Sequence, residues 1–233
     1  MKFYEGRTIN KIQMPITNIC NRRCPDCCAR EQLMWYNSSI KEREVAIEEL
    51  RRVGQLIGPI SQMEITGGEP TMHSKFDEIS NNLTELFQCN DFMLVTNGWL
   101  FGVEPRKLSL LMNYKRVWLS HYTEEFAAKN GGKSNTAECE AIERFVSDTP
   151  HTELIPFTPA HHIPYAAPPY SGIPCIHYRS GMITCYQGNL YGCCVAWSLP
   201  LKAASIPLTE DWREHLTELD TPCENCFITG PRQ

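Results

Sequence analysis

Three cysteines near the amino terminus have the spacing of a loop that can wrap a small metal cluster. Cys20, Cys24 and Cys27 are separated by four and then three positions. Thiolates are soft ligands that suit zinc and iron–sulfur clusters. Three thiolates would occupy three irons of a cubane and leave the fourth iron open, and an open metal position is typical of catalysis. The spacing favours a catalytic cluster over a zinc knuckle or a set of buried thiols.

The composition agrees with metal binding inside a cell. Twelve cysteines in 233 residues is far above ordinary usage, and the amino terminus lacks the apolar core of a signal peptide. The sequence also has no run of 18 apolar residues, so no membrane span is expected. A net charge of -5 gives no support for nucleic acid as a partner. We therefore expect a cytoplasmic protein whose cysteines bind metal rather than form disulfides.

The elements that must position the cysteines alternate between two hydrophobic periods. Short β-branched or apolar runs predict strands, and helical faces of apolar residues lie between them. The predicted strands are Ile12–Thr17, Gln62–Thr66, Phe92–Thr96, Val117–Ser120 and Leu154–Phe157. The first predicted helix has Ala46, Leu50, Val53 and Ile57 on one face, and the second has Phe76, Ile79, Leu83 and Leu86 on one face, with Ser74 as its N-cap. A third helix is expected to begin at Pro105 and a fourth to cover Thr136–Val146.

This alternation predicts an α/β fold with parallel strands and right-handed crossovers. Five strands and four helices fit a partial (β/α)5-6 TIM-like barrel, and a doubly wound sheet is the alternative. We expect the barrel to cover residues 1–160. A proline-rich connector would follow at 161–174, and a small C-terminal domain at 175–233. In that last part we expect a hairpin around Gly188-Asn189 and a helix over Thr209–Leu219.

With the segment Gly67-Gly68-Glu69-Pro70 after the second strand, the chain resembles the radical S-adenosylmethionine (SAM) superfamily, whose motif is CxxxCxxC. The resemblance implies one [4Fe-4S] cluster on the three cysteines and SAM chelated to the open iron. It also implies reductive cleavage of SAM to a 5′-deoxyadenosyl radical, with an electron donor such as flavodoxin or ferredoxin. The residues expected to contact SAM are Asp26, Gly67, Gly68, Glu69, Pro70, Thr96, Asn97 and Ser120. Asp26 departs from the family, which usually has an aromatic residue there.

Four later cysteines form a second constellation. Cys175 is followed by twelve residues, Gly188, four residues and Cys193, and then by Cys223-Glu-Asn-Cys226. This pattern resembles the twitch type of the SPASM/twitch auxiliary domains and implies a second [4Fe-4S] cluster. A structural zinc site on the same four residues is the alternative. Cys185 and Cys194 compete for a place among the ligands.

The general plan resembles the small 2-deoxy-scyllo-inosamine dehydrogenase type. That resemblance implies oxidation or rearrangement of a small-molecule substrate such as a sugar, cyclitol or nucleoside, assisted by the auxiliary cluster. Modification of a peptide or protein side chain, or of a nucleic-acid base, is the alternative, and a non-catalytic metal-binding module is a third hypothesis. The short segment before the first strand leads us to expect no peptide-recognition module. The candidate proton acceptors are His121, which follows the fourth strand, and His161 and His162 in the connector.

Overall fold

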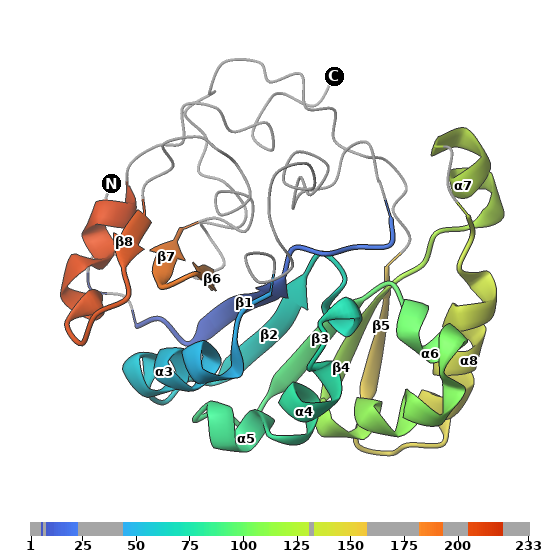
Figure 1. Cartoon of the computed structure of the whole chain (residues 1–233), viewed down its shortest axis with the longest axis horizontal. Helices are drawn as coiled ribbons and strands as arrows, with labels where there is room; N and C mark the ends of the chain where they lie inside the picture. The colour runs from blue at the N-terminus through green and yellow to red at the C-terminus, as the bar shows by residue number, and fades with distance from the viewer. Residues whose placement is uncertain are drawn as a thin grey trace.

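The computed structural model describes residues 6, 8–22, 44–130, 133–157, 182–192 and 205–220. These residues form an α/β fold built on an eight-stranded sheet in the order β5-β4-β3-β2-β1-β6-β7-β8 (Figure 1). The strands are β1 (Lys11–Thr17), β2 (Gln62–Gly67), β3 (Phe92–Thr96), β4 (Arg116–Ser120), β5 (Glu153–Phe157), β6 (Met182–Tyr186), β7 (Asn189–Tyr191) and β8 (Ser205–Pro207). All five strands predicted for the first part of the chain are confirmed to within one residue at each end.

The first five strands are parallel and neighbours in sequence are neighbours in the sheet. A chain that moves one strand at a time in one direction keeps its crossovers on one face, as in a barrel. A doubly wound sheet would reverse direction within this run. The fold is therefore a partial, open TIM-like barrel, as the sequence predicted.

Most helices lie on one face of the sheet, where they cover its apolar residues, whereas α7 stands beyond the sheet (Figure 1). The helices are α3 (Ile47–Ile57), η1 (Pro70–Met72), α4 (Phe76–Asn81), α5 (Leu83–Leu86), α6 (Trp99–Val103), η2 (Pro105–Asn113), α7 (Glu124–Asn130), α8 (Thr136–Ser147) and η4 (Trp212–Asp220). Ile12, Met14 and Ile16 of β1 are fully buried against them. Within the described residues, no helix is long and apolar enough to cross a bilayer.

Three expectations about the helices were wrong in detail. Ser74 does not cap the second helix, because its amide and hydroxyl both donate to the Glu44 carboxylate, at 2.8 and 2.6 Å. That helix is broken into α4 and α5 at Asn82, whose side chain donates to the Glu78 carbonyl at 2.7 Å. The helix that begins at Pro105 is a 3₁₀ helix, and the short helix α6 precedes it.

The described part of the C-terminal region continues the same sheet. Strand β6 pairs in parallel with β1, and β7 and β8 follow antiparallel. The expected hairpin is present, but its turn residues are Gln187 and Gly188, both with positive φ, and Asn189 begins β7. The expected helix is the 3₁₀ helix η4, and its Trp212 is fully buried and donates to the Leu56 carbonyl of α3. The proposed domain borders at 160 and 175 lie outside the described residues.

Candidate functional site

Polar and sulfur-bearing residues gather where the parallel strands end. Because the carboxyl ends of parallel strands share one edge of the sheet, residues that follow them are neighbours. Cys20 follows β1, Gly67–Pro70 ends and follows β2, Thr96 and Asn97 end and follow β3, and Ser120 ends β4. Hydrogen bonds join these segments, so this edge is one site assembled from four strands.

The centre of the site is the Glu69 carboxylate, which is 1% exposed. Its Oε1 accepts hydrogen bonds from the hydroxyls of Thr71 and Thr96, both at 2.6 Å, and from the Thr71 amide at 3.3 Å. Its Oε2 accepts the Asn97 amide at 2.7 Å. Burial raises the pKa of the Glu69 carboxyl, and the four accepted hydrogen bonds oppose that rise. The side chain fastens the loop after β2 to the end of β3.

Gly67 lets the loop after β2 lie directly against the end of β1. A Cβ at Gly67, whose φ is +156°, would overlap the carbonyl oxygen of Thr17. The amide of residue 68 donates to that same carbonyl at 2.8 Å, and the Glu69 amide donates to the Ile19 carbonyl at 2.8 Å. Gly67 and these two backbone hydrogen bonds therefore set the position of the loop relative to the chain that leads to Cys20.

The Cys20 sulfur lies at this edge in surroundings that suit a thiolate ligand. It is half-buried and accepts the Arg22 amide at 3.4 Å. The side-chain oxygen of the adjacent Asn21 accepts the side-chain amide of Asn97 at 2.9 Å, which connects the cysteine loop to β3. An amide donor stabilises negative charge on sulfur. Cys20 thus fits the part of a cluster ligand, and Cys24 and Cys27 lie outside the described residues.

Asn135, which sequence reasoning missed, joins the ends of β3 and β4. Its side chain is 1% exposed. Its amide nitrogen donates to the carbonyls of Asn97 and Ser120, at 2.7 and 2.8 Å, and its oxygen accepts the Tyr122 amide at 2.6 Å. Asn135 stands at the N-cap position of α8, yet its side chain makes no capping hydrogen bond there. An asparagine before a helix would ordinarily be interpreted as a cap.

Comparison with known proteins decides the family. A model of the radical SAM superfamily matches residues 14–146, which is more than half of the chain. This chain belongs to the radical SAM superfamily. Enzymes of this superfamily use a [4Fe-4S] cluster and SAM, and the matched residues include Cys20, the loop after β2 and Asn135.

Curated relatives of this radical SAM protein match it over shorter segments. A GTP 3′,8-cyclase from Actinobacillus succinogenes is 30% identical over 95 residues, which cover 40% of this chain and 27% of that protein. A GTP 3′,8-cyclase from Clostridium perfringens is 28% identical over 112 residues, 47% of this chain and 33% of that protein. The match thus spans about a third or less of each relative's length.

Solved structures agree with the fold of this radical SAM protein. A crystal structure of BtrN in complex with AdoMet and 2-DOIA has a TM-score of 0.56 and 13% identity, and the match covers 94% of this chain and 84% of BtrN. BtrN in an open conformation has a TM-score of 0.51 and 16% identity, with 95% and 93% covered. At this identity the likeness concerns the fold.

His121 is the one described member of the three predicted proton acceptors. Its amide donates to the Phe157 carbonyl at 2.8 Å, and its ring Nε2 lies 3.1 Å from the Thr136 hydroxyl at the start of α8. That hydroxyl also contacts Ser134, at 2.8 Å. The ring is therefore engaged by α8, and its catalytic role stays a prediction. His161 and His162 lie outside the described residues.

Most residues of the second constellation are also outside the described chain. They are Cys175, Cys193, Cys194, Cys223 and Cys226, and Asp26 of the first motif is outside as well. Cys185 is described and is fully buried in the apolar core, where burial raises the pKa of its thiol to about 12. The candidacy of Cys185 for the auxiliary set stays a prediction.

Two further cysteines behave as core residues. Cys89 is 5% exposed and Cys139 is 1% exposed, and both pack in the main apolar cluster. Burial raises the pKa of both thiols, that of Cys139 to about 12. Neither side chain lies at a strand end with Cys20. They serve as structural thiols and as internal controls for experiments on the cluster.

A buried histidine next to the site gives a prediction about pH. His73 Nε2 donates to the Val45 carbonyl at 3.0 Å, and its Nδ1 accepts the Lys75 amide at 3.0 Å, a pattern that requires the neutral ring. Burial lowers the pKa of His73 below its ordinary 6.5. The neutral ring therefore stabilises the fold fully above pH 6.5, and this contribution is lost as the pH falls through the lower folded pKa.

We expect the stability advantage of the wild type over His73→Gln to shrink between pH 7.5 and pH 5.5. Urea unfolding of both proteins at several pH values would measure this difference, because groups that titrate in both proteins cancel. An advantage that grew as the pH fell would show that the charged ring is the favoured form.

Proposed function

We propose that this chain cleaves SAM reductively at the carboxyl edge of β1–β4 and removes a hydrogen atom from a small molecule such as a sugar, cyclitol or nucleoside. The observation that supports it is that hydrogen bonds join the segment that carries Cys20, the Gly67–Glu69 loop and Asn97 at one sheet edge. When bound, a reduced [4Fe-4S] cluster would supply the electron for this cleavage. A low-potential donor such as flavodoxin or ferredoxin is the proposed reductant.

In this proposal each residue of the edge has a binding or orienting part. Cys20 is one of three cluster ligands, with Cys24 and Cys27. The loop at Gly67 and Gly68 offers backbone groups to the amino group of SAM. Glu69 holds that loop in place through its hydrogen bonds to Thr96 and Asn97. Asn97 follows β3 and Ser120 ends β4, and in this proposal both contact the rest of SAM.

We further propose a second [4Fe-4S] cluster on Cys175, Cys193, Cys223 and Cys226. Removal of a hydrogen atom from a carbon that bears a hydroxyl leaves a one-electron-oxidised substrate. Transfer of a second electron to the auxiliary cluster and loss of the hydroxyl proton would complete a two-electron oxidation to a carbonyl. Cluster potentials span roughly -700 to +450 mV, which makes such a transfer feasible. The spacing of the four cysteines supports this assignment.

A nucleotide substrate is the second candidate. The observation in its favour is that curated relatives that match up to 47% of this chain are GTP 3′,8-cyclases. Such a reaction would rearrange the substrate after hydrogen removal and would not require net oxidation. The two candidates differ in their products, since oxidation converts an alcohol to a carbonyl and cyclisation forms a bond within the nucleotide.

The test is anaerobic reconstitution of the full chain with iron and sulfide, followed by reduction and addition of SAM. We expect about eight irons per chain for two cubanes and release of 5′-deoxyadenosine measured by liquid chromatography. Incubation with cyclitols, amino sugars and GTP, with mass spectrometry of products, then separates the two candidates. Reconstituted protein that binds one zinc, or that binds iron and releases no 5′-deoxyadenosine, would contradict the proposal. An iron count of about four would contradict the auxiliary cluster alone.

A further inference from the structure

An arginine between the first two cysteines of the motif ties the cysteine loop to the segment between β4 and α8, residues 121–135. Arg22 lies two residues after Cys20, and its backbone amide donates to the Cys20 sulfur at 3.4 Å. Its side chain leads away from the loop. The Nη1 atom donates to the Lys133 carbonyl at 2.7 Å, and the guanidinium carbon lies 4.2 Å from the centroid of the Tyr122 ring. Arg22 therefore joins a candidate cluster ligand to that segment at two points.

The segment that receives the Arg22 side chain is itself fixed to the carboxyl edge of the sheet. The Asn135 side chain accepts the Tyr122 amide at 2.6 Å and donates to carbonyls at the ends of β3 and β4. The Tyr122 ring also packs on Phe126 of α7, with 5.5 Å between the ring centroids. Helix α7 stands beyond this edge of the sheet (Figure 1). The Arg22 guanidinium thus rests on a support that the strand ends hold in place.

The Arg22 side chain carries a positive charge that no carboxylate neutralises within the residues that the structure describes. None of the ion pairs found there includes Arg22. The side chain is half-buried, and its Nε is fully buried without a hydrogen-bond acceptor among those residues. A buried donor that lacks an acceptor is unfavourable, so such a group indicates that an acceptor belongs next to it. The sulfur atoms of an iron–sulfur cluster accept hydrogen bonds of this kind.

Arg213 offers a matched comparison, because it is anchored in the same way at another place in the fold. Its guanidinium donates to the Ile57 carbonyl at 2.6 Å and lies 4.3 Å from the centroid of the Trp212 ring. Ile57 ends α3, which precedes the amino end of β2, so this arginine stands away from the carboxyl edge. A change at Arg213 therefore controls for the loss of a guanidinium anchor as such.

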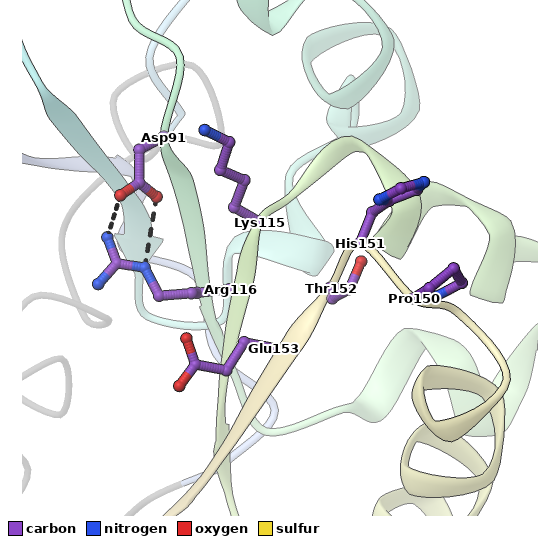
Figure 2. A pocket seen from close by; sticks show the side chains of 7 residues that line it. All are labelled: Asp91, Lys115, Arg116, Pro150, His151, Thr152 and Glu153. Atoms are coloured by element: carbon purple, nitrogen blue, oxygen red, sulfur yellow. Dashed lines mark hydrogen bonds and ion pairs between the residues drawn. The ribbon is translucent and has the colours of Figure 1, made fainter.

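The opposite ends of the strands supply a control for net charge. A cavity of about 720 Å³ opens there, and Lys115 and Arg116 are among its lining residues (Figure 2). Both oxygens of Asp91 accept hydrogen bonds from Arg116, whereas Lys115 is an exposed ammonium. Lys115 precedes Ser120 by five residues, about 16 Å at strand rise, which is beyond the Debye length of about 8 Å at physiological salt. Removal of the Lys115 charge should therefore not be felt at the carboxyl edge.

A fixed positive charge beside an iron–sulfur cluster makes the cluster easier to reduce. One-electron reduction adds a negative charge to the cluster, and the protein sets the potential through net charge, burial and hydrogen bonds to the sulfurs. A half-buried cation acts more strongly than an exposed one, because water and salt screen it less. A guanidinium is charged at any pH at which proteins are folded, so the effect of Arg22 does not depend on its titration.

We propose that Arg22 is a positioning residue for the SAM-binding cluster. It fixes the cysteine loop on the segment between β4 and α8, and it holds a permanent positive charge and the buried Nε–H beside the cluster, which raises the reduction potential of the cluster. The inference rests on the proposed function for the presence of that cluster, and it goes beyond that function by assigning how the cluster is held and tuned. Arg22 acts through the cluster and the loop and not on the substrate.

The first test is the reduction potential of the reconstituted full chain, followed by electron paramagnetic resonance. The relevant cluster is the one whose signal changes when SAM is added. Arg22→Gln should make its reduction roughly tenfold less favourable, a fall of about 59 mV for one electron. Arg22→Lys keeps the charge and should hold the reduction equilibrium within about threefold of the wild type. Arg213→Gln and Lys115→Gln should leave the potential unchanged.

The second test is hydrogen exchange of the full chain before reconstitution, measured by mass spectrometry, so that its result does not depend on a cluster. The Tyr122 amide donates to the Asn135 side chain, and the Asn135 amide donates to the Tyr122 carbonyl at 3.2 Å. Both amides should exchange roughly tenfold faster in Arg22→Gln, because the segment loses its contact with the cysteine loop. Arg213→Gln should leave these two amides unchanged and loosen the end of α3 instead.

An unchanged potential in Arg22→Gln, an equal fall in Lys115→Gln, or unchanged exchange at Tyr122 and Asn135 would overturn the inference. In each of these cases a wild type that releases 5′-deoxyadenosine leaves the proposed function standing. A wild type that assembles no iron–sulfur cluster contradicts the proposed function and this inference together. The two failures are therefore distinguishable.

Discussion

Replacing Cys20 by alanine is expected to lower the iron content of the reconstituted protein from about eight to about four per chain and to abolish release of 5′-deoxyadenosine. The physical reason is that the two remaining thiolates, Cys24 and Cys27, would hold the first cubane poorly. The proposed auxiliary cluster has four cysteine ligands of its own and should be unaffected. Cys20 is half-buried at the end of β1, and its sulfur accepts the Arg22 amide. Substitution there removes a ligand and little apolar packing, so the fold should survive.

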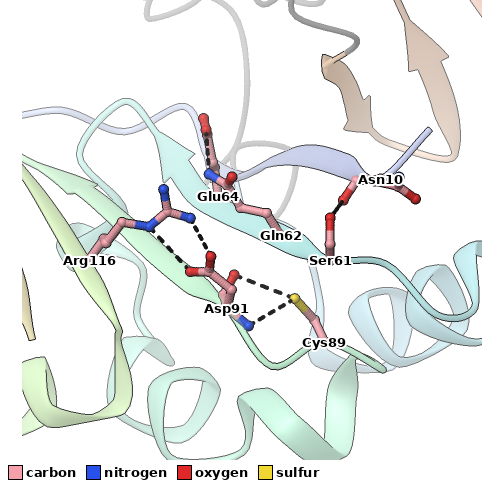
Figure 3. A network of polar contacts seen from close by, with 7 residues as sticks. All are labelled: Asn10, Ser61, Gln62, Glu64, Cys89, Asp91 and Arg116. Carbon is pink, nitrogen blue, oxygen red and sulfur yellow. Dashed lines mark hydrogen bonds and ion pairs between the residues drawn. The ribbon is translucent and has the colours of Figure 1, made fainter. Parts of the chain in front are cut away.

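The matched control for this change is Cys89→Ala. Cys89 is buried in the core, and its sulfur contacts the backbone of Asp91 at the far end of β3 (Figure 3). Its loss should cost about 1–2 kcal/mol of stability by removal of packing and leave the iron count unchanged. Iron analysis, the absorbance of the clusters near 400 nm and urea unfolding separate the two effects. Loss of four irons in Cys89→Ala, or none in Cys20→Ala, would contradict the ligand assignment.

The sequence predicted those parts of the molecule that depend on local pattern. The strands were found because apolar runs such as Phe92–Thr96 must be buried on both sides of a parallel sheet. The strand-end position of the Gly67–Pro70 loop followed from the run before it.

Features that depend on residues distant in the chain could not be predicted from the sequence. Ser74 has the residue type of an N-cap, but Glu44, thirty positions earlier, takes both of its donors. The place of β6 beside β1 depends on a long connection and not on local propensity. Asn135 stands before a helix, where its type indicates a cap, and only the folded chain brings the ends of β3 and β4 to its side chain. We therefore expect stability and SAM binding to be coupled at Asn135.

Replacing Asn135 by alanine is expected to lower the free energy of unfolding by about 3 kcal/mol and to weaken SAM binding by about tenfold. The substitution leaves the carbonyls of Asn97 and Ser120 without their donor and the Tyr122 amide without its acceptor. Each buried group that loses its partner costs roughly 1–3 kcal/mol, and partial relaxation or entry of water reduces the sum. The control is Asn113→Ala, because that amide is exposed and contacts only other polar side chains.

A purely structural role and a positioning role for Asn135 make different predictions. If Asn135 positions the SAM site, Asn135→Ala should keep its iron and raise the KM for SAM, and its kcat at saturating SAM should approach that of the wild type. The KM for SAM should rise because Asn135 holds the residues Asn97 and Ser120 in position. The iron should be kept because the cysteine segment keeps its connection to Asn97 through Asn21, which does not involve Asn135. A variant that loses stability and shows an unchanged KM for SAM would assign Asn135 to the fold alone. Equal loss in Asn113→Ala would show that the effect is not specific to the strand ends.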